Sequence, residues 1–339
     1  MRRRIAWTIL FLIAAAAAAL PLSQDAVERF YSRGFFPPLQ QALTTMSNLV
    51  PFAVFDAMWM GAVALAVVVI RRQVRAHGWL GGAARSLRAL GCAAVVIYLA
   101  FLATWGLNYR RVPMFEKVVF HPERVTQEES SRLGEWAVNE LNTHYAAAHK
   151  SPLSLDALRS SFDATLGSLG GAPIVVGRPK ATLLGWYFHK ASIAGMTDPF
   201  LLETMLAPDL LDVERPFVIA HEWAHLAGYA DESEANFVAY LACRRGDALA
   251  RYSAGLVMIG YARPARSINA ALEMGPKLDL LAIQARYART SGTLRFAARE
   301  GYDKYLKANR VERGIESYDA VVQLILGTEF DANGNPRLR

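Results

Sequence analysis

The sequence predicts a mainly α-helical membrane protein, in which three N-terminal transmembrane helices precede an α+β domain with a small sheet. Three observations lead to this prediction. First, three stretches in the N-terminal third carry almost no charge, and each has about the length that a helix needs to cross a bilayer. Second, the rest of the 339 residues reads as helical segments separated by Gly and Pro. Third, one of those segments carries the pattern His-Glu-x-x-His, which is typical of a metal-binding helix.

The predicted transmembrane helices cover about residues 5–22, 51–70 and 89–107. A cleaved signal peptide is an alternative for the first segment, because it follows three arginines and ends in Ala-rich sequence. The length of its apolar run favours an uncleaved anchor instead. The second and third segments lie too far into the chain for that alternative. The chain is therefore predicted to contain a membrane anchor, residues 1–107, that sits in the lipid bilayer, and an outer domain, residues 108–339.

The arginines of the membrane anchor predict its orientation. Three precede the first segment, and five lie between the second and third, where there is no acidic residue: Arg2, Arg3, Arg4, Arg71, Arg72, Arg75, Arg85 and Arg88. Such residues flank transmembrane helices on the cytoplasmic side, which predicts a cytoplasmic N-terminus and an extracytoplasmic outer domain. The same arginines account for the whole formal net charge of +7, so no basic surface is left for nucleic acid as a partner.

The outer domain is predicted to be helical with a few short strands. Thr126 and Ser154 are predicted N-caps, since a hydroxyl before an amphipathic segment can accept from the first free amides of a helix. The predicted helices cover residues 126–148, 154–166, 216–228, 231 onwards, 247–261, 277–288, 293–307 and 315–326. The predicted strands cover residues 174–177, 183–189 and 200–206. The tail, residues 331–339, is predicted to be disordered.

The helix from Pro216 to Gly228 carries the pattern with chemical meaning. His221 and His225 are four residues apart, so both imidazoles lie on one helix face and can bind one metal ion. Glu222 lies beside them, at the position of a general base for a metal-activated water. The surrounding residues are almost all apolar, which predicts a buried helix. Burying these three side chains without partners would cost several kcal/mol, and one zinc ion removes that cost.

Three carboxylates downstream compete to be the third zinc ligand: Asp231, Glu232 and Glu234. Gly228 ends the metal helix, and Asp231 is a predicted N-cap of the next one. Glu232 and Glu234 are about 200° apart on that helix, so both cannot face the metal. Glu232 shares its face with small residues that allow close approach, which favours Glu232. Glu234 and Asp231 remain alternatives, and the spacing of Asp231 from His225 is that of a variant metzincin pattern.

The motif with its downstream Glu-x-Glu-Ala-Asn resembles the gluzincin zinc metallopeptidases. A more extensive resemblance is to an uncharacterised bacterial family of three-pass membrane proteins, a domain of unknown function. It is carried by residues 31–34, 106–111, 199–200, 221–237, 305–309 and 317–318. This resemblance implies a zincin-like outer domain and a peptidase in the bacterial cytoplasmic (inner) membrane. In gluzincins a Tyr, His or Arg from the C-terminal region stabilises the oxyanion, which makes Tyr302, Tyr305 and Tyr318 candidates.

The predicted function is peptide hydrolysis outside the cytoplasm, on peptide or protein substrates that include membrane-associated ones. His221, His225 and Glu232 would hold zinc and leave one position open, and Glu222 would act as the general base. The alternative is a non-catalytic binding or assembly module with a structural zinc ion. Glu222 argues against that alternative, because a structural site has no use for an acid there. His121 and His189 are expected to be structural or surface residues.

Overall fold

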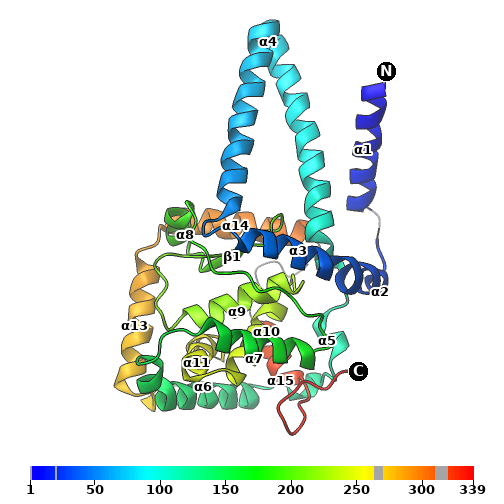
Figure 1. Cartoon of the computed structure of the whole chain (residues 1–339). Helices are drawn as coiled ribbons and strands as arrows, with labels where there is room; N and C mark the ends of the chain where they lie inside the picture. Colours follow the sequence, from blue (N-terminus) through cyan, green and yellow to red (C-terminus); the bar gives the residue numbers. More distant parts are fainter. Residues whose placement is uncertain (1, 20, 263–269, 310–319) are drawn as a thin grey trace.

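The computed structural model of the chain describes residues 2–19, 21–262, 270–309 and 320–339. These residues are mainly helical, with one sheet of two short strands. Figure 1 shows a long helical hairpin standing on a helical outer domain, with helix α1 (Arg2–Ala19) beside it. The prediction of a mainly α protein with a small sheet is confirmed at this level.

The hairpin is helix α4 (Val54–Thr104), which folds back on itself at Gly78. Gly78 has φ +71°, a backbone conformation that residues with a Cβ rarely adopt. The two arms contain most of the predicted spans 51–70 and 89–107, whose outermost three residues lie outside α4, and the arginines between the spans lie around the turn. Among the described residues, α4 is long and apolar enough to cross a membrane. The strongly bent pair Trp7–Ala19 and Gln24–Asn48 passes the same criteria when taken as one span.

Between α1 and α4, the chain crosses the base of the hairpin as α2 (Gln24–Ala26), η1 (Val27–Phe35) and α3 (Phe36–Asn48). Helix α3 is bound to the outer domain through its polar side chains. The Gln40 amide pairs with both backbone groups of Val175, at 2.7 and 3.1 Å. The Thr44 hydroxyl donates to the Leu202 carbonyl at 2.9 Å. The anchor segment and the outer domain therefore share one packed interface.

These contacts correct the prediction of a strand at residues 174–177. The segment forms no strand, because side-chain amides of α3 hydrogen-bond to its backbone groups. The strand predicted at 183–189 is also wrong, since helix α8 (Gly185–Ala191) lies there. Asp56, at the start of α4, accepts from the Leu183 amide at 2.8 Å and so satisfies a free donor just before that helix.

The sheet consists of β1 (Gly195–Thr197) and β2 (Thr204–Leu206), paired antiparallel with Met196 opposite Met205. Only part of the strand predicted at 200–206 forms, and β1 was not predicted. All three residues of β2 are buried, and both strands pack against helix α9 (Arg215–Leu226). Because β1 is only three residues long, it carries too little alternation for the sequence to reveal it.

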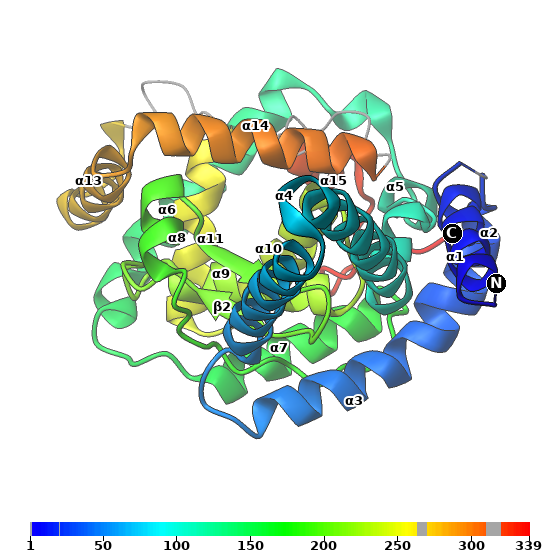
Figure 2. The same cartoon turned by 90° about the horizontal axis from the view of Figure 1, so that it is seen from above.

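The outer domain begins with short turns, η2 (Gly106–Arg110), α5 (Met114–Lys117) and η3 (Pro122–Arg124). In its core, α7 (Leu155–Ser168), α10 (Glu232–Arg245) and α11 (Ala248–Ala262) pack against α9, and α6 (Gln127–Ala148) packs against α11. Thr126 and Ser154 accept from the amides of Glu129 and Ala157, which confirms both predicted N-caps. Seen from above, the hairpin stands over α9 and α10, between α3 and α14 (Gly292–Ala308) (Figure 2).

The C-terminal region completes the domain with α13 (Met274–Ala288) and α15 (Ala320–Gly327). The predicted helix 315–326 is confirmed from Ala320 onwards, and its positions 315–319 lie outside the described residues. The prediction of a disordered tail is wrong. The Val119 amide donates to the Arg337 carbonyl at 2.8 Å, and the Arg339 amide donates to the Lys117 carbonyl at 3.0 Å. Backbone hydrogen bonds to a distant segment hold the tail in place, and the sequence of the tail itself does not predict these bonds.

Candidate metal centre

Two consecutive helices, α9 and α10, bring the predicted metal ligands together. Gly228 has φ +82° and lets the chain leave α9 in a tight turn, in which the Tyr229 amide donates to the Ala224 carbonyl at 3.0 Å. Asp231 then caps α10, accepting from the amides of Ser233 and Glu234. Glu232 is the first residue of α10, so the short turn sets its side chain against the histidines of α9.

The geometry of this metal-binding triad, His221, His225 and Glu232, fits one zinc ion. The two Nε2 atoms are 3.1 Å apart, and Glu232 Oε2 lies 3.2 Å from that of His221 and 3.6 Å from that of His225. Ligands about 2.0–2.1 Å from a tetrahedral zinc ion are about 3.3 Å from one another. Each of the three side chains offers one possible ligand atom, and these atoms lie within 4.8 Å of one another. Among the described residues, no other group of three or more His, Cys, Asp or Glu side chains is arranged in this way.

The hydrogen bonds of the triad leave its ligand atoms available. His225 pairs through Nδ1 with the Tyr229 carbonyl at 2.7 Å, so a neutral imidazole keeps its lone pair on Nε2. Glu232 Oε2 is buried and lies within 3.6 Å of both Nε2 atoms, without a well-aligned hydrogen bond to either. A buried carboxylate oxygen in this position is costly unless a positive charge, such as that of a bound cation, neutralises it. The same residues therefore satisfy both the distances and the chemistry of a metal site.

Without a metal, the carboxylate and the imidazoles of the triad stabilise each other's charge. Burial would raise the pKa of Glu232, but the two imidazoles beside it hold that pKa well below its usual range. Burial would lower the pKa of His225, but the Glu232 carboxylate raises it to about 9. A proton on the imidazole thus replaces the missing positive charge. A divalent cation would perform the same neutralisation without that proton.

Glu222 lies beside the triad without belonging to it. One of its oxygens, Oε2, accepts from the Thr197 hydroxyl at 2.8 Å, and the side chain is fully buried. Burial raises its pKa, although His221 and His225 oppose this shift. Strand β1 lies so close to the Glu222 side chain that a Cβ on Gly195 would be 2.6 Å from Glu222 Oε1. The sheet therefore positions a carboxylate that the helix alone would leave free to turn.

The sequence that forms this centre matches the model of a known protein family. The model is described as "Protein of unknown function (DUF3810)" and covers residues 31–326. The chain belongs to this family. The match runs from η1 through the hairpin and the metal-binding triad to α15, which supports the predicted uncharacterised family. No curated protein and no solved structure matches the chain.

The remaining candidate residues have other partners. Glu234 accepts from the Met114 amide at 2.6 Å, and burial raises its pKa to about 7. Asp231 is occupied as the N-cap of α10. His189 pairs with Asp209 at 2.6 Å. His121 lies between Glu123 and Glu329, at 2.9 Å from each. Both histidines thus lie outside the triad, in agreement with their predicted structural role.

Of the two candidate tyrosines among the described residues, Tyr302 reaches the triad. The Tyr302 hydroxyl donates to Glu232 Oε1, and its ring stacks on that of Tyr305. The Tyr305 hydroxyl lies 3.5 Å from that of Tyr109. Tyr318 lies outside the described residues. In this arrangement Tyr302 orients the carboxylate of Glu232 from α14.

The sequence did not reveal the residue that joins the centre to the hairpin. The indole Nε1 of Trp105, directly after α4, donates to the His225 carbonyl at 3.0 Å. Its ring meets the His225 ring edge to face at 6.0 Å. The only signal in the sequence was a tryptophan at the end of a predicted span, which is equally typical of membrane-interface aromatics.

Proposed function

We propose that the chain is a membrane-anchored, zinc-dependent peptidase that hydrolyses peptide bonds outside the cytoplasm. One observation carries the proposal: three ligand atoms meet at zinc-like spacing beside a buried carboxylate that is not one of them. Zinc bound by three protein ligands keeps a coordination position open, which is the arrangement of catalytic sites.

The residues divide the work as follows. His221, His225 and Glu232 would hold zinc, which, when bound, lowers the pKa of a water molecule and polarises a carbonyl. Glu222 would accept the proton of the attacking water at its carboxylate and then deliver it to the leaving amine. Thr197 keeps this carboxylate oriented through its hydroxyl. Tyr302 holds the ligand carboxylate of Glu232, and such supporting hydrogen bonds raise metal affinity.

Membrane-associated peptides are the favoured substrates in this proposal. The centre lies at the base of the hairpin, one hydrogen bond from Trp105 at its end. Large apolar side chains are exposed around that base, on or beside α3, α8 and α14: Met46, Leu49, Phe52, Leu183, Trp186 and Phe296. Exposed apolar side chains around a membrane-proximal site suit contact with lipid.

The test is metal analysis and peptide cleavage by the purified full-length chain. Full length is required because α3 and Trp105 contribute to the packing of the outer domain. We expect about one zinc ion per chain, and cleavage of peptides from a library that includes lipidated ones. Bound zinc with no cleavage of any peptide would favour the structural-zinc alternative, and a chain that binds no zinc would exclude both.

The proposal includes three membrane spans with a cytoplasmic N-terminus. The supporting observations are the length and composition of the hairpin helix, the bent pair Trp7–Ala19 and Gln24–Asn48, which passes the same criteria as one span, and the gathering of arginines at the turn of the hairpin, opposite the outer domain. We expect alkaline phosphatase fused after Arg339 to be active and a green fluorescent protein fused there to be dark. The reverse pattern, with an N-terminal fluorescent fusion as the positive control, would overturn this topology.

A further inference from the structure

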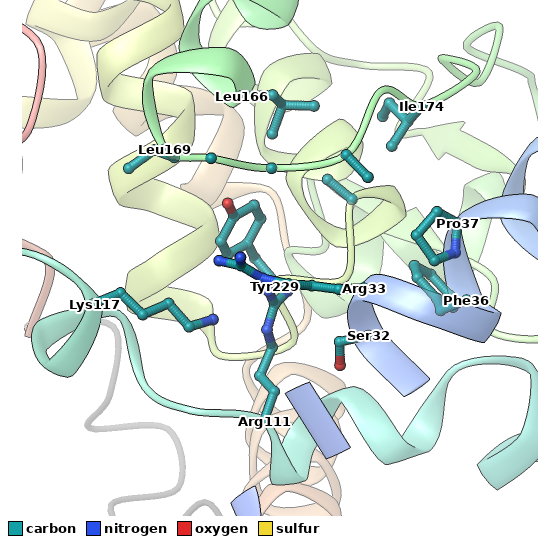
Figure 3. Close-up of a pocket in the computed structure, with 14 residues that line it drawn as sticks. Ser32, Arg33, Phe36, Pro37, Arg111, Lys117, Leu166, Leu169, Ile174 and Tyr229 are labelled. Atoms are coloured by element: carbon teal, nitrogen blue, oxygen red, sulfur yellow. The ribbon is translucent and has the colours of Figure 1, made fainter. Parts of the chain in front are cut away.

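A second site lies at the base of the hairpin, in a cavity that none of the four residues of the metal centre lines. Its space is about 450 Å³ including the part open to solvent, and its enclosed part is small. The polar ends of Arg33, Arg111 and Lys117 point into this space, as Figure 3 shows, and Leu166 and Ile174 lie across from them. No acidic residue lines the cavity. We call it the cation cavity.

The three cations share one carboxylate. Glu28 pairs with Arg33 at 3.0 Å, with Arg111 at 2.9 Å and with Lys117 at 2.8 Å. The Arg111 guanidinium also donates to the Gly228 carbonyl at 2.9 Å. Each cation carries more N–H donors than these bonds use. Positive charge and donors are therefore in excess on one wall of the cavity.

Burial makes that excess costly. The side chains of Arg111 and Lys117 are 9% and 13% exposed. Burial and the neighbouring Arg111 lower the pKa of Lys117 to about 8, despite the opposing charges of Glu234 and Glu28. Burial would raise the pKa of Glu28, yet Arg111 and Lys117 lower it to about 2, so this acid is charged throughout the physiological range. Glu28 and Glu234 together carry at most two negative charges against three positive ones, and a bound anion would balance the remainder.

We infer that the cation cavity binds a phosphate group. Cations from three elements, η1, the segment after η2, and α5, approach from different directions, which suits a tetrahedral anion with several acceptor oxygens better than a planar carboxylate. The Tyr229 side chain adds a hydroxyl group to the lining. The apolar wall accommodates carbon atoms esterified to the phosphate. The site does not depend on zinc, since its ligands are distinct from the metal-binding triad.

Two sources supply this chemistry, a phospholipid headgroup and a soluble phosphate compound. The test measures binding to the full-length chain in neutral detergent, by native mass spectrometry and by thermal shift. The probes are inorganic phosphate, phosphatidylglycerol, and diacylglycerol as a lipid without phosphate, all at matched ionic strength. Competition by phosphate against phosphatidylglycerol shows whether both occupy one site.

The decisive variant is Arg33→Gln with Lys117→Gln, which keeps a polar side chain at both positions and removes two charges. We expect its phosphate affinity to fall by about tenfold or more, because charge-assisted hydrogen bonds to the anion are lost. The matched control is Arg29→Gln, on the same segment but outside the cation cavity, which should bind as the wild type does. If the double variant does not fold, Arg33→Gln alone replaces it in the binding measurement. The Arg33 side chain is half exposed, so its substitution should not prevent folding.

Retention of phosphatidylglycerol but not of diacylglycerol would support a headgroup site. Binding of inorganic phosphate without lipid retention would support a soluble phosphate ligand. The inference is overturned if neither phosphate probe binds the wild type, or if the charge-removing variant binds as tightly as the wild type. None of these outcomes depends on zinc content or peptide cleavage, so the experiment tests the phosphate site independently of the proposed metal site.

Discussion

Replacing Glu222 with glutamine is expected to abolish peptide cleavage while the bound zinc and the fold are retained. Glutamine has nearly the shape of glutamate, and its amide oxygen can still accept from the Thr197 hydroxyl. The amide has no basicity, so it cannot take the proton of the attacking water. A positioned general base contributes about two to four orders of magnitude in rate, and we expect a loss of that size. The measurement is the cleavage rate of the best library peptide at saturating zinc.

The matched control for this variant is Glu140→Gln. Glu140 is also a buried carboxylate, but it lies on α6 and pairs with Arg251 at 2.7 Å, away from the metal centre. Its removal should affect stability more than cleavage. If Glu222→Gln cleaved peptides as fast as the wild type, Glu222 would not be the base, and the proposed division of roles would fail with it.

The second large effect is expected from either histidine. His221→Ala and His225→Ala should lose zinc during purification, since two ligands hold the ion far less well than three. The free energy of unfolding should fall by about 3–5 kcal/mol, because the buried Glu232 carboxylate is left without its neutralising partner. Chelation should lower the melting temperature of the wild type and leave that of both variants unchanged.

His189→Ala is the control, because that histidine is partly buried and pairs with a carboxylate outside the triad. Full zinc occupancy in either triad variant would refute the site. The carboxylates add a ranking: Glu232→Ala should lower zinc occupancy more than Glu234→Ala or Asp231→Ala. The reverse ranking would show that another carboxylate is the third zinc ligand, and the assignment of the two histidines would be unchanged.

Local patterns in the sequence predicted those parts of the protein that depend on neighbours within a few residues. His221 and His225 share a helix face because of the helical repeat alone, and the buried character of their helix followed from its composition. The N-caps at Thr126 and Ser154 are equally local. The apolar stretches of α4 predicted its arms, because transfer into a bilayer depends on length and composition.

Other features depend on contacts between distant segments, and only the tertiary structure decided them. Residues 174–177 looked like a strand, yet Gln40 and Asn48 of α3 supply its hydrogen-bond partners. The tail is ordered by Lys117 and Val119, about two hundred residues earlier in the chain. Backbone groups accept any partner of suitable geometry, so their pairing cannot be read from the sequence beside them.

The metal centre shows the same division. The sequence alone determined the two histidines and the adjacent acid, and it favoured Glu232 from helix geometry. Only the fold decided what surrounds them, with Thr197 from the sheet, Trp105 from the end of the hairpin and Tyr302 from α14. The cation cavity was also beyond the sequence, because Arg33 and Lys117 are far apart in the chain and meet through Glu28. Helical periodicity acts over four residues, whereas side chains from separate elements become neighbours only when the whole core packs.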